Sequence, residues 1–278
     1  MKLGIMQGRL VPPEADRFQS FPRFRWRDEF ALAAAAGLDT IEWIYDAHGE
    51  DVNPLGTDPG IAELLRLCTL HRVSIESICA DWFMDFPLVG IDEATALLRW
   101  RRLEWLMDRG ARLGINRIVV PFVDAAAIRL RQDAAAVTAG INALGEVIER
   151  TDVELHLETA LAADDFAALL AGIPHPRVKV NYDSGNSASL GFRPLAEFAA
   201  YGRRVGSVHL KDRRRGAGTV PLGEGDTDFD ELFNVLATHR YGGDFILQVA
   251  RGAPGNELAW ARANADTGRR MMQRLVRA

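Results

Sequence analysis

The sequence predicts an α/β protein, a (β/α)8 TIM barrel that takes up residues 1–278 as a single domain. Short β-branched, apolar runs alternate with longer helical segments, which is typical of parallel strands joined by helical crossovers. The alternation repeats about eight times, the number at which such a sheet closes into a barrel. The length of 278 residues also suits one barrel domain.

An open doubly wound sheet is the alternative fold. It is expected to carry a glycine-rich turn that opens a helix directly after the first strand. The first turn here is GRLVPP, residues 8–13, and its prolines prevent a prompt helix start. The turn therefore favours the barrel.

The first half of the chain supplies four strands, expected at residues 2–7, 39–45, 73–80 and 116–122. Residues 9–25 lack periodicity and predict a long loop before a helix at 26–36, which Gly37 ends. Asp58 is expected to cap a helix at 58–71, with Pro59 at its first position. A long helix at 92–113 ends at Gly114.

The second half repeats the pattern, with strands expected at 153–158, 178–183, 205–210 and 244–249. An alanine-rich segment predicts a helix at 133–150, and shorter helices are expected at 164–170 and 194–201. A loop with four glycines precedes a helix at 228–239, and a helix at 257–276 closes the series.

Composition excludes several classes of protein. A formal net charge of −5 and a pI near 5.7 argue against a nucleic-acid partner. No apolar run approaches the length of a membrane span, and the N-terminus lacks a signal segment, so we expect no membrane partner and a cytoplasmic location. The two cysteines, Cys68 and Cys79, are expected to be free thiols. The oligomeric state is left open, and a homo-oligomer is one alternative.

Four strands of the second half end on polar side chains that can bind a metal: Glu158, Asp183, His209 and Gln248. In a barrel of this type the site lies at the C-terminal ends of the strands. Polar and apolar residues alternate in these strands, so the polar ones are expected to face the lumen together. Carboxylates, an imidazole and an amide suit a divalent metal ion: Mn²⁺ first, with Mg²⁺, Co²⁺ or Zn²⁺ as alternatives.

The motifs at these ends resemble a known family. The segments HLET, NYDSGNS, VHLKDR and GEGDTDF, with GIMQGRL and IEW near the N-terminus, resemble the xylose isomerase-like sugar isomerase/epimerase superfamily over essentially the whole chain. The resemblance implies that Glu158, Asp183 and His209 are metal ligands and that the fourth ligand position falls on Gln248. It also implies a small-molecule carbohydrate substrate.

The implied activity is that of a divalent-metal-dependent isomerase or epimerase of a sugar, sugar phosphate or related polyol. The bound ion stabilises the enediolate formed when a C–H bond beside a carbonyl is deprotonated. Glu158 is the expected base, with Glu42 as a second candidate carboxylate; the other reading of Glu42 is a partner for a nearby arginine. The remaining expected site residues are catalytic Lys211 and the substrate-binding Gln7, Arg9, Asn186, Arg213 and Glu224, the last of which is expected to fix Lys211 or Arg213.

Two positions depart from the family pattern. Gln248 stands where the epimerases usually carry a glutamate that shares proton transfer with the strand-five glutamate, and an amide cannot take a proton. Asn186 stands where the family often has histidine.

Three other functions stay open. A keto-polyol dehydratase of the inosose type uses the same fold and enediolate, and a non-catalytic metal- or sugar-binding barrel would fit the loss of the second glutamate. A DNA-repair endonuclease of the superfamily is disfavoured by the acidic charge and by the presence of only six histidines.

Overall fold

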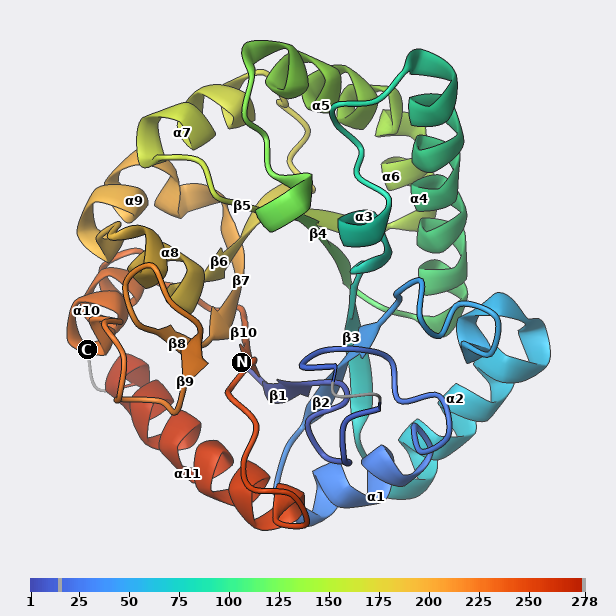
Figure 1. Ribbon diagram of the computed structural model, residues 1–278, viewed down its shortest axis with the longest axis vertical. Helices are drawn as coiled ribbons and strands as arrows, with labels where there is room; N and C mark the ends of the chain where they lie inside the picture. Colours follow the sequence, from blue (N-terminus) through green and yellow to red (C-terminus); the bar gives the residue numbers. More distant parts are fainter. Residues whose placement is uncertain (15–16, 277–278) are drawn as a thin grey trace.

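The computed structural model describes residues 1–14 and 17–276, and within them it shows a closed barrel of eight parallel strands (Figure 1). Neighbouring strands follow the order β1, β10, β7, β6, β5, β4, β3, β2 around the barrel. Their bounds are β1 (Leu3–Met6), β2 (Thr40–Ile44), β3 (Ser74–Cys79), β4 (Arg117–Phe122), β5 (Glu154–Thr159), β6 (Val178–Asp183), β7 (Val205–Leu210) and β10 (Asp244–Leu247). The predicted (β/α)8 barrel is confirmed.

Helices surround the barrel and cover its outer face (Figure 1). They are α1 (Asp28–Ala35), α2 (Asp58–His71), α4 (Glu93–Leu113), α5 (Arg131–Ala143), α6 (Gly145–Thr151), α7 (Ala163–Ala171), α9 (Pro194–Tyr201), α10 (Phe229–Thr238) and α11 (Glu257–Val276). The segment predicted as one helix at 133–150 is two helices, because Leu144 takes φ −83° and ψ 3° and Gly145 follows it. No helix of residues 1–14 and 17–276 is long and apolar enough to cross a membrane.

The helix ends follow the local sequence signals. The side chain of Asp92 accepts a hydrogen bond from Thr95 N at the start of α4, and Gly114 ends that helix with φ of +80°. The cap of α2 is Thr57, whose hydroxyl accepts from Gly60 N, so the prediction that Asp58 caps this helix is wrong by one residue.

Short elements that the sequence did not predict follow the C-terminal ends of three strands and surround the barrel mouth (Figure 1). After β3 comes α3 (Trp82–Asp85), after β6 comes α8 (Ser184–Leu190), and after β7 comes a small hairpin of β8 (Asp212–Arg213) and β9 (Thr219–Val220). The loop after β4 holds the short 3₁₀ helix η2 (Asp124–Ala126). Elements η1 (Pro54–Gly56) and η3 (Gly202–Arg204) lie in two other connections.

The barrel lumen is polar, whereas the layer between strands and helices is apolar. Arg117 and Asp244 form an ion pair of 3.2 Å and are nearly buried, from β4 and β10. Above them, His156 Nδ1 lies 2.7 Å from Ser207 Oγ. Gly4 makes room in β1, because a Cβ there would lie 2.5 Å from Cγ2 of Thr40. The lumen therefore carries polar side chains up to the mouth, as the alternation in β5 to β7 predicted.

Candidate metal centre and substrate pocket

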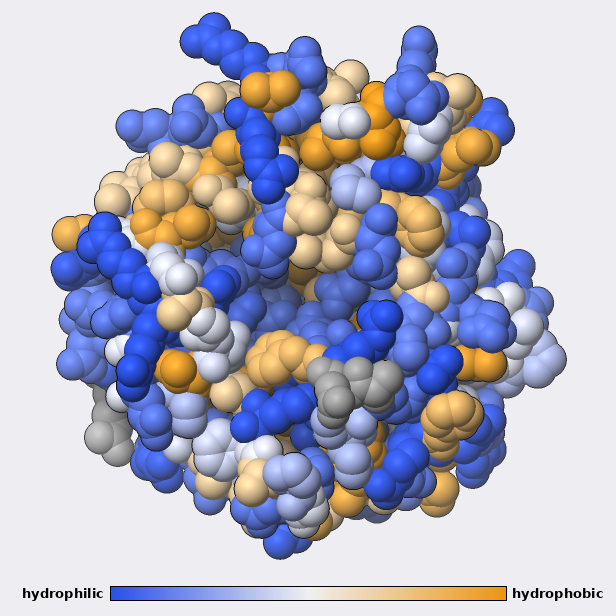
Figure 2. All heavy atoms as spheres, viewed as in Figure 1, coloured by the Kyte–Doolittle hydropathy of each residue, from blue (hydrophilic) through white to orange (hydrophobic). Residues whose placement is uncertain are grey.

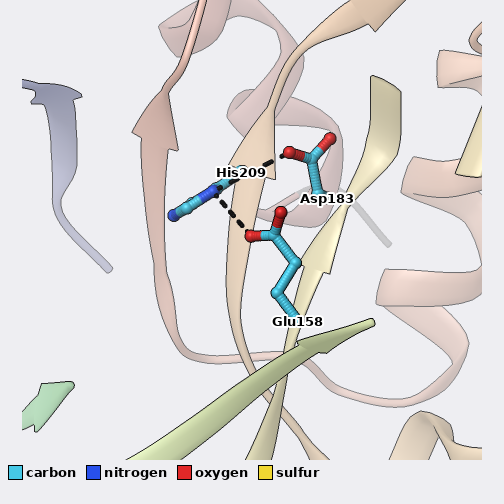
Figure 3. A group of neighbouring side chains, drawn as sticks. All are labelled: Glu158, Asp183 and His209. Atoms are coloured by element: carbon cyan, nitrogen blue, oxygen red, sulfur yellow. Dashed lines mark ion pairs between the residues drawn. The ribbon is translucent and has the colours of Figure 1, made fainter. Parts of the chain in front are cut away.

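Three metal-competent side chains converge at the mouth of the barrel (Figure 3). Glu158, Asp183 and His209 come from the adjacent strands β5, β6 and β7, and Asp183 is in direct register with His209. One ligand atom from each lies within 4.8 Å of the others, and all three residues are buried. His209 Nδ1 lies 3.4 Å from Glu158 Oε2 and 4.0 Å from Asp183 Oδ2. This spacing leaves room for one cation between an imidazole nitrogen and two carboxylates.

The donor atoms fit a divalent ion. His209 Nδ1 is buried, faces the two carboxylates and makes no hydrogen bond to any described residue. An unpartnered buried nitrogen is costly, and a bound cation would satisfy it. The two carboxylates would balance the charge of a divalent ion.

Glu42 lies behind the imidazole. Its Oε1 is 2.7 Å from His209 Nε2, its Oε2 accepts a hydrogen bond of 2.6 Å from Ser77 Oγ, and the residue is fully buried. Burial alone lowers the pKa of His209, but the charges of Glu42 and Glu158 outweigh burial and raise that pKa to about 10. Burial also raises the pKa of Glu42, but His209 and Arg117 more than compensate and leave it below its ordinary value. A carboxylate on the far nitrogen of a histidine orients the ring toward a metal.

This position corrects the expectation for Glu42. The carboxylate is not on the pocket wall, so it does not reach a substrate in this structure. The alternative, a partner for an arginine, is also incomplete, because the direct contact is with His209 and Arg117 acts only through its charge. Glu42 therefore contacts His209 and not the cavity.

Two amides hold the carboxylate of Glu158. Asn181 Nδ2 donates to Oε2 at 2.7 Å, and Asn186 Nδ2 donates to Oε1 at 2.8 Å. Asn181 is itself fixed, because its Oδ1 accepts from Ser207 Oγ at 2.6 Å. Hydrogen bonds on both oxygens fix the orientation of the carboxylate at the pocket.

Lys211 is the centre of a second group on the pocket wall. Its Nζ lies 3.2 Å from Asp183 Oδ2, 3.2 Å from Asn186 Oδ1 and 3.3 Å from Gln248 Oε1. Arg213 NH1 also donates to Asn186 Oδ1, at 2.9 Å. Lys211 and Arg213, which follow β7, thus bring two positive charges to the wall of the pocket.

Gln248 follows β10 and lines the same pocket. Its Oε1 faces Lys211, and its Nε2 donates to Gln19 Oε1 at 3.0 Å. The amide orientation is therefore set by partners on both sides. Lys211 Nζ contacts both Gln248 Oε1 and Asp183 Oδ2, and so links Gln248 to the candidate metal centre.

Three predicted substrate contacts lie elsewhere. Gln7 is fully buried, and its Oε1 accepts from Ile44 N at 2.9 Å. Arg9 is buried too, and it donates to Val249 O, Phe18 O and Gln19 Oε1. Glu224 is exposed, and its carboxylate contacts neither Lys211 nor Arg213 among the described residues. The structure does not place these three side chains in contact with the pocket: Gln7 contacts β2, Arg9 braces the first loop, and Glu224 is exposed.

Asp212 organises the glycine loop in place of Glu224. The Asp212 carboxylate is fully buried and accepts three backbone hydrogen bonds, from Gly223, Gly225 and Thr227, at 2.8–3.1 Å. A Cβ at Gly225 would lie 2.2 Å from Asp212 Oδ1, so the close approach requires glycine there. The sequence analysis missed this role, although the spacing of an aspartate before a glycine-rich turn was visible.

Gln19 and Asp81 are two further pocket residues that the sequence analysis missed. Asp81 lies two residues after the end of β3, close to the kind of position that singled out the four strand ends in the second half. Gln19 comes from the loop after β1, where no periodicity marks it. Gln19 Nε2 donates to Asp81 Oδ2 at 2.7 Å.

The pocket is a cavity of about 350 Å³ at the mouth, where Figure 2 shows a hollow bordered largely by hydrophilic side chains. Its lining includes Glu158, Asn186, Lys211, Arg213 and Gln248. A volume of this size suits a small molecule. Polar groups of both charges suit a ligand with many hydroxyl groups.

The pocket and a buried carboxylate–histidine group lie at the C-terminal ends of the barrel strands, where TIM-barrel enzymes have their active sites. The chain belongs to the xylose isomerase-like TIM barrel family, whose sequence profile matches residues 30–274.

Named relatives of this chain are enzymes. An inosose dehydratase of Clostridium tetani is 26% identical over 218 residues, which cover 66% of this chain and 73% of the relative. An L-ribulose-5-phosphate 3-epimerase, UlaE, of Shigella flexneri is 24% identical over 240 residues, with 81% and 82% covered.

Solved structures share the fold. The D-psicose 3-epimerase of Clostridium cellulolyticum H10, solved with D-tagatose, has a TM-score of 0.75 at 16% identity, covering 98% of this chain and 99% of that one. The IOLI protein, solved with a bound zinc atom, has a TM-score of 0.73 at 14% identity, covering 99% and 98%.

Proposed function

We propose that this protein is a divalent-metal-dependent isomerase or epimerase of a sugar, sugar phosphate or related polyol, acting through an enediolate. The observation that carries the proposal is the convergence of Glu158, Asp183 and the unpartnered Nδ1 of His209 beside a polar cavity. Gln248 is proposed as the fourth ligand, since it lines the same cavity as Glu158 and its Oε1 shares the contact of Lys211 Nζ with Asp183. A cation held there would supply Lewis-acid polarisation of a carbonyl and of its neighbouring hydroxyl.

Glu158 is the proposed base. Its carboxylate lines the cavity, and the amides of Asn181 and Asn186 fix its direction, so it can receive a proton from a carbon held beside it. Lys211 and Arg213 lie on the same wall, where they can hold a substrate oxygen or an anionic group. Asn186 contacts both the base and the two basic side chains: its Nδ2 donates to Glu158, and its Oδ1 accepts from Lys211 and Arg213.

The donor atoms support a choice of metal ion, and the pocket supports a choice of substrate. Carboxylate and amide oxygens with one imidazole favour Mn²⁺, with Mg²⁺, Co²⁺ and Zn²⁺ as alternatives; the zinc of the IOLI structure supports a metal at such a centre. A small carbohydrate is the proposed substrate. The cytoplasmic location and the oligomeric state stay predictions.

A keto-polyol dehydratase is the second candidate, favoured by the inosose dehydratase relatives. It begins with the same deprotonation, so product analysis separates it from isomerisation. A non-catalytic barrel would bind metal or sugar without turnover.

The test is incorporation of deuterium from solvent into a panel of sugars, sugar phosphates and inososes, with and without Mn²⁺. Wild-type protein should introduce deuterium beside a carbonyl only when the cation is present. Glu158→Gln at saturating Mn²⁺ should lose about 100-fold or more of this exchange, the usual contribution of a base. Glu224→Gln changes an exposed carboxylate and is the matched control. Exchange without Mn²⁺, or an active Glu158→Gln variant, would contradict the proposal.

A further inference from the structure

Asp81 is a pocket carboxylate that the proposed mechanism does not use. It lies two residues after the end of β3, and it lines the same cavity as Glu158. Its two oxygens are fixed from different elements: Gln19 Nε2 donates to Oδ2 at 2.7 Å, and Cys79 Sγ donates to Oδ1 at 3.2 Å. No cation forms an ion pair with it among the described residues. A fixed carboxylate without a cationic partner at a polar cavity is suited to exchange protons with a ligand.

A chain of side-chain contacts links Asp81 to the place where the family pattern is broken. Lys211 Nζ faces Gln248 Oε1, Gln248 Nε2 donates to Gln19 Oε1, and Gln19 Nε2 donates to Asp81. Arg9 NH2 also donates to Gln19 Oε1 at 2.9 Å, which fixes which end of the Gln19 amide faces Asp81. We call this chain, Lys211–Gln248–Gln19–Asp81, the amide bridge.

The amide bridge depends on an amide at position 248. A carboxylate has no proton to donate, so a glutamate there would set one of its oxygens against Gln19 Oε1. The amide of Gln248 cannot act as a proton-transfer group at the end of the eighth barrel strand. The same amide donates to Gln19 and so supports the orientation of Gln19 toward Asp81.

We propose that Asp81 is the second proton-transfer group of the reaction, in place of the carboxylate that position 248 lacks. This inference rests on the proposed function, and in it Gln19 is a positioning residue. The substrate C–H bond breaks, its proton passes to Glu158, and its electron pair enters the enediolate. A new C–H bond forms with the proton of the acid form of Asp81, which ends as a carboxylate while Glu158 ends as an acid. Exchange with water restores both groups, so nothing is oxidised or reduced.

The electrostatics of Asp81 agree with this role. Burial, together with the charges of Asp46 and Glu158, outweighs the hydrogen bonds from Gln19 and Cys79 and raises the pKa of Asp81 to about 6. Arg9 lies behind Gln19; burial lowers its pKa, and the charge of Asp81 opposes that shift. Arg17, Lys211 and Arg213 line the same cavity as Asp81. An acid with a pKa in this range supplies both protonation states near neutral pH.

The test separates deprotonation from product formation in the Mn²⁺-loaded protein in D₂O. With Asp81→Asn, deuterium exchange through Glu158 should persist, while the rate of product formation should fall by about 100-fold or more. Glu224→Gln removes the charge of an exposed carboxylate outside the pocket lining and should keep the wild-type ratio of product to exchange. An Asp81→Asn variant with the wild-type ratio would overturn the inference. Wild-type protein without exchange on any substrate would instead overturn the proposed function.

Gln19→Met keeps the inference testable if Asp81→Asn does not fold. Loss of the Gln19 donor should raise the pKa of Asp81, because that hydrogen bond lowers it. The acid form then persists to higher pH, so the alkaline limb of the pH profile of product formation should move to higher pH. An unmoved limb would show that Asp81 is not the acid.

Discussion

Binding of a divalent cation should release a proton from His209, and the structure gives the size of the effect. The pKa of His209 is raised to about 10 in the metal-free site, whereas a metal ligand nitrogen must be unprotonated. At pH 7, removing that proton costs about 4 kcal/mol, at about 1.36 kcal/mol per pH unit. Metal affinity should therefore rise about tenfold per pH unit from pH 6 to pH 8.5.

The assay is calorimetric titration of Mn²⁺ in buffers of different ionisation enthalpy, which counts the protons released. About one proton per cation is expected at pH 7. Glu42→Gln is the informative variant, because a glutamine can still accept from His209 and donate to Ser77 while its charge is gone. The pKa of His209 should fall, so the variant should release fewer protons near neutral pH and show a shallower pH slope. Once the cost of the displaced proton is subtracted from each measured affinity, the variant should bind Mn²⁺ about 10- to 100-fold more weakly than the wild type.

If the wild-type affinity does not change with pH and no proton is released, His209 is already neutral or does not bind the cation. An unchanged slope in Glu42→Gln would remove Glu42 from its positioning role. Glu224→Gln, which alters an exposed carboxylate, should match the wild-type slope.

Three further outcomes follow from the described contacts. Gln248→Glu should bind Mn²⁺ more tightly, because a charged ligand attracts the ion more strongly than an amide, and should change the ratio of epimeric product to exchange; calorimetry and product analysis check both. Asp212→Asn should cost about 1–3 kcal/mol of unfolding free energy in thermal or urea denaturation, because an amide nitrogen would face a backbone N–H, whereas Glu224→Gln should cost nothing measurable. Burial raises the pKa of Glu29 to about 7 from 4.5, so the folded state binds more protons between these pH values and stability falls as pH rises through them. The loss is about 3 kcal/mol, and Glu29→Gln should flatten it in urea melts at pH 4.5 and pH 8.

The strands, and the convergence of Glu158, Asp183 and His209, could be predicted from the sequence because both depend on local sequence patterns. Alternation in β5, β6 and β7 fixes which side chains face inward, and parallel strands bring their C-terminal ends to one mouth. Asp81 lies at a similar position after β3 but was not singled out.

Other parts of the site depend on contacts that no local pattern records. Gln19 lies in an aperiodic loop, and only the closed barrel brings it to Asp81 and Gln248. Glu42 looked like a pocket carboxylate because it ends a strand, yet the depth of its side chain places it behind His209. The loop glycines bind Asp212 because it is buried beneath them, which the sequence order of Asp212 and Glu224 does not reveal.

The contact between Glu42 and His209 also makes formation of the site depend on closure of the barrel. The three converging ligands lie on consecutive strands of the second half, whereas Glu42 lies on β2, separated from β7 by β1 and β10, near the two ends of the chain. A partly assembled sheet of β5 to β7 can gather the two carboxylates but leaves the imidazole unsupported. Only the last strand to be synthesised, β10, joins β1 to β7 and brings Glu42 against the ring. A cation that binds best to the supported ring would therefore stabilise the fully closed protein over its open intermediates, so adding metal during refolding should raise the yield of closed barrel.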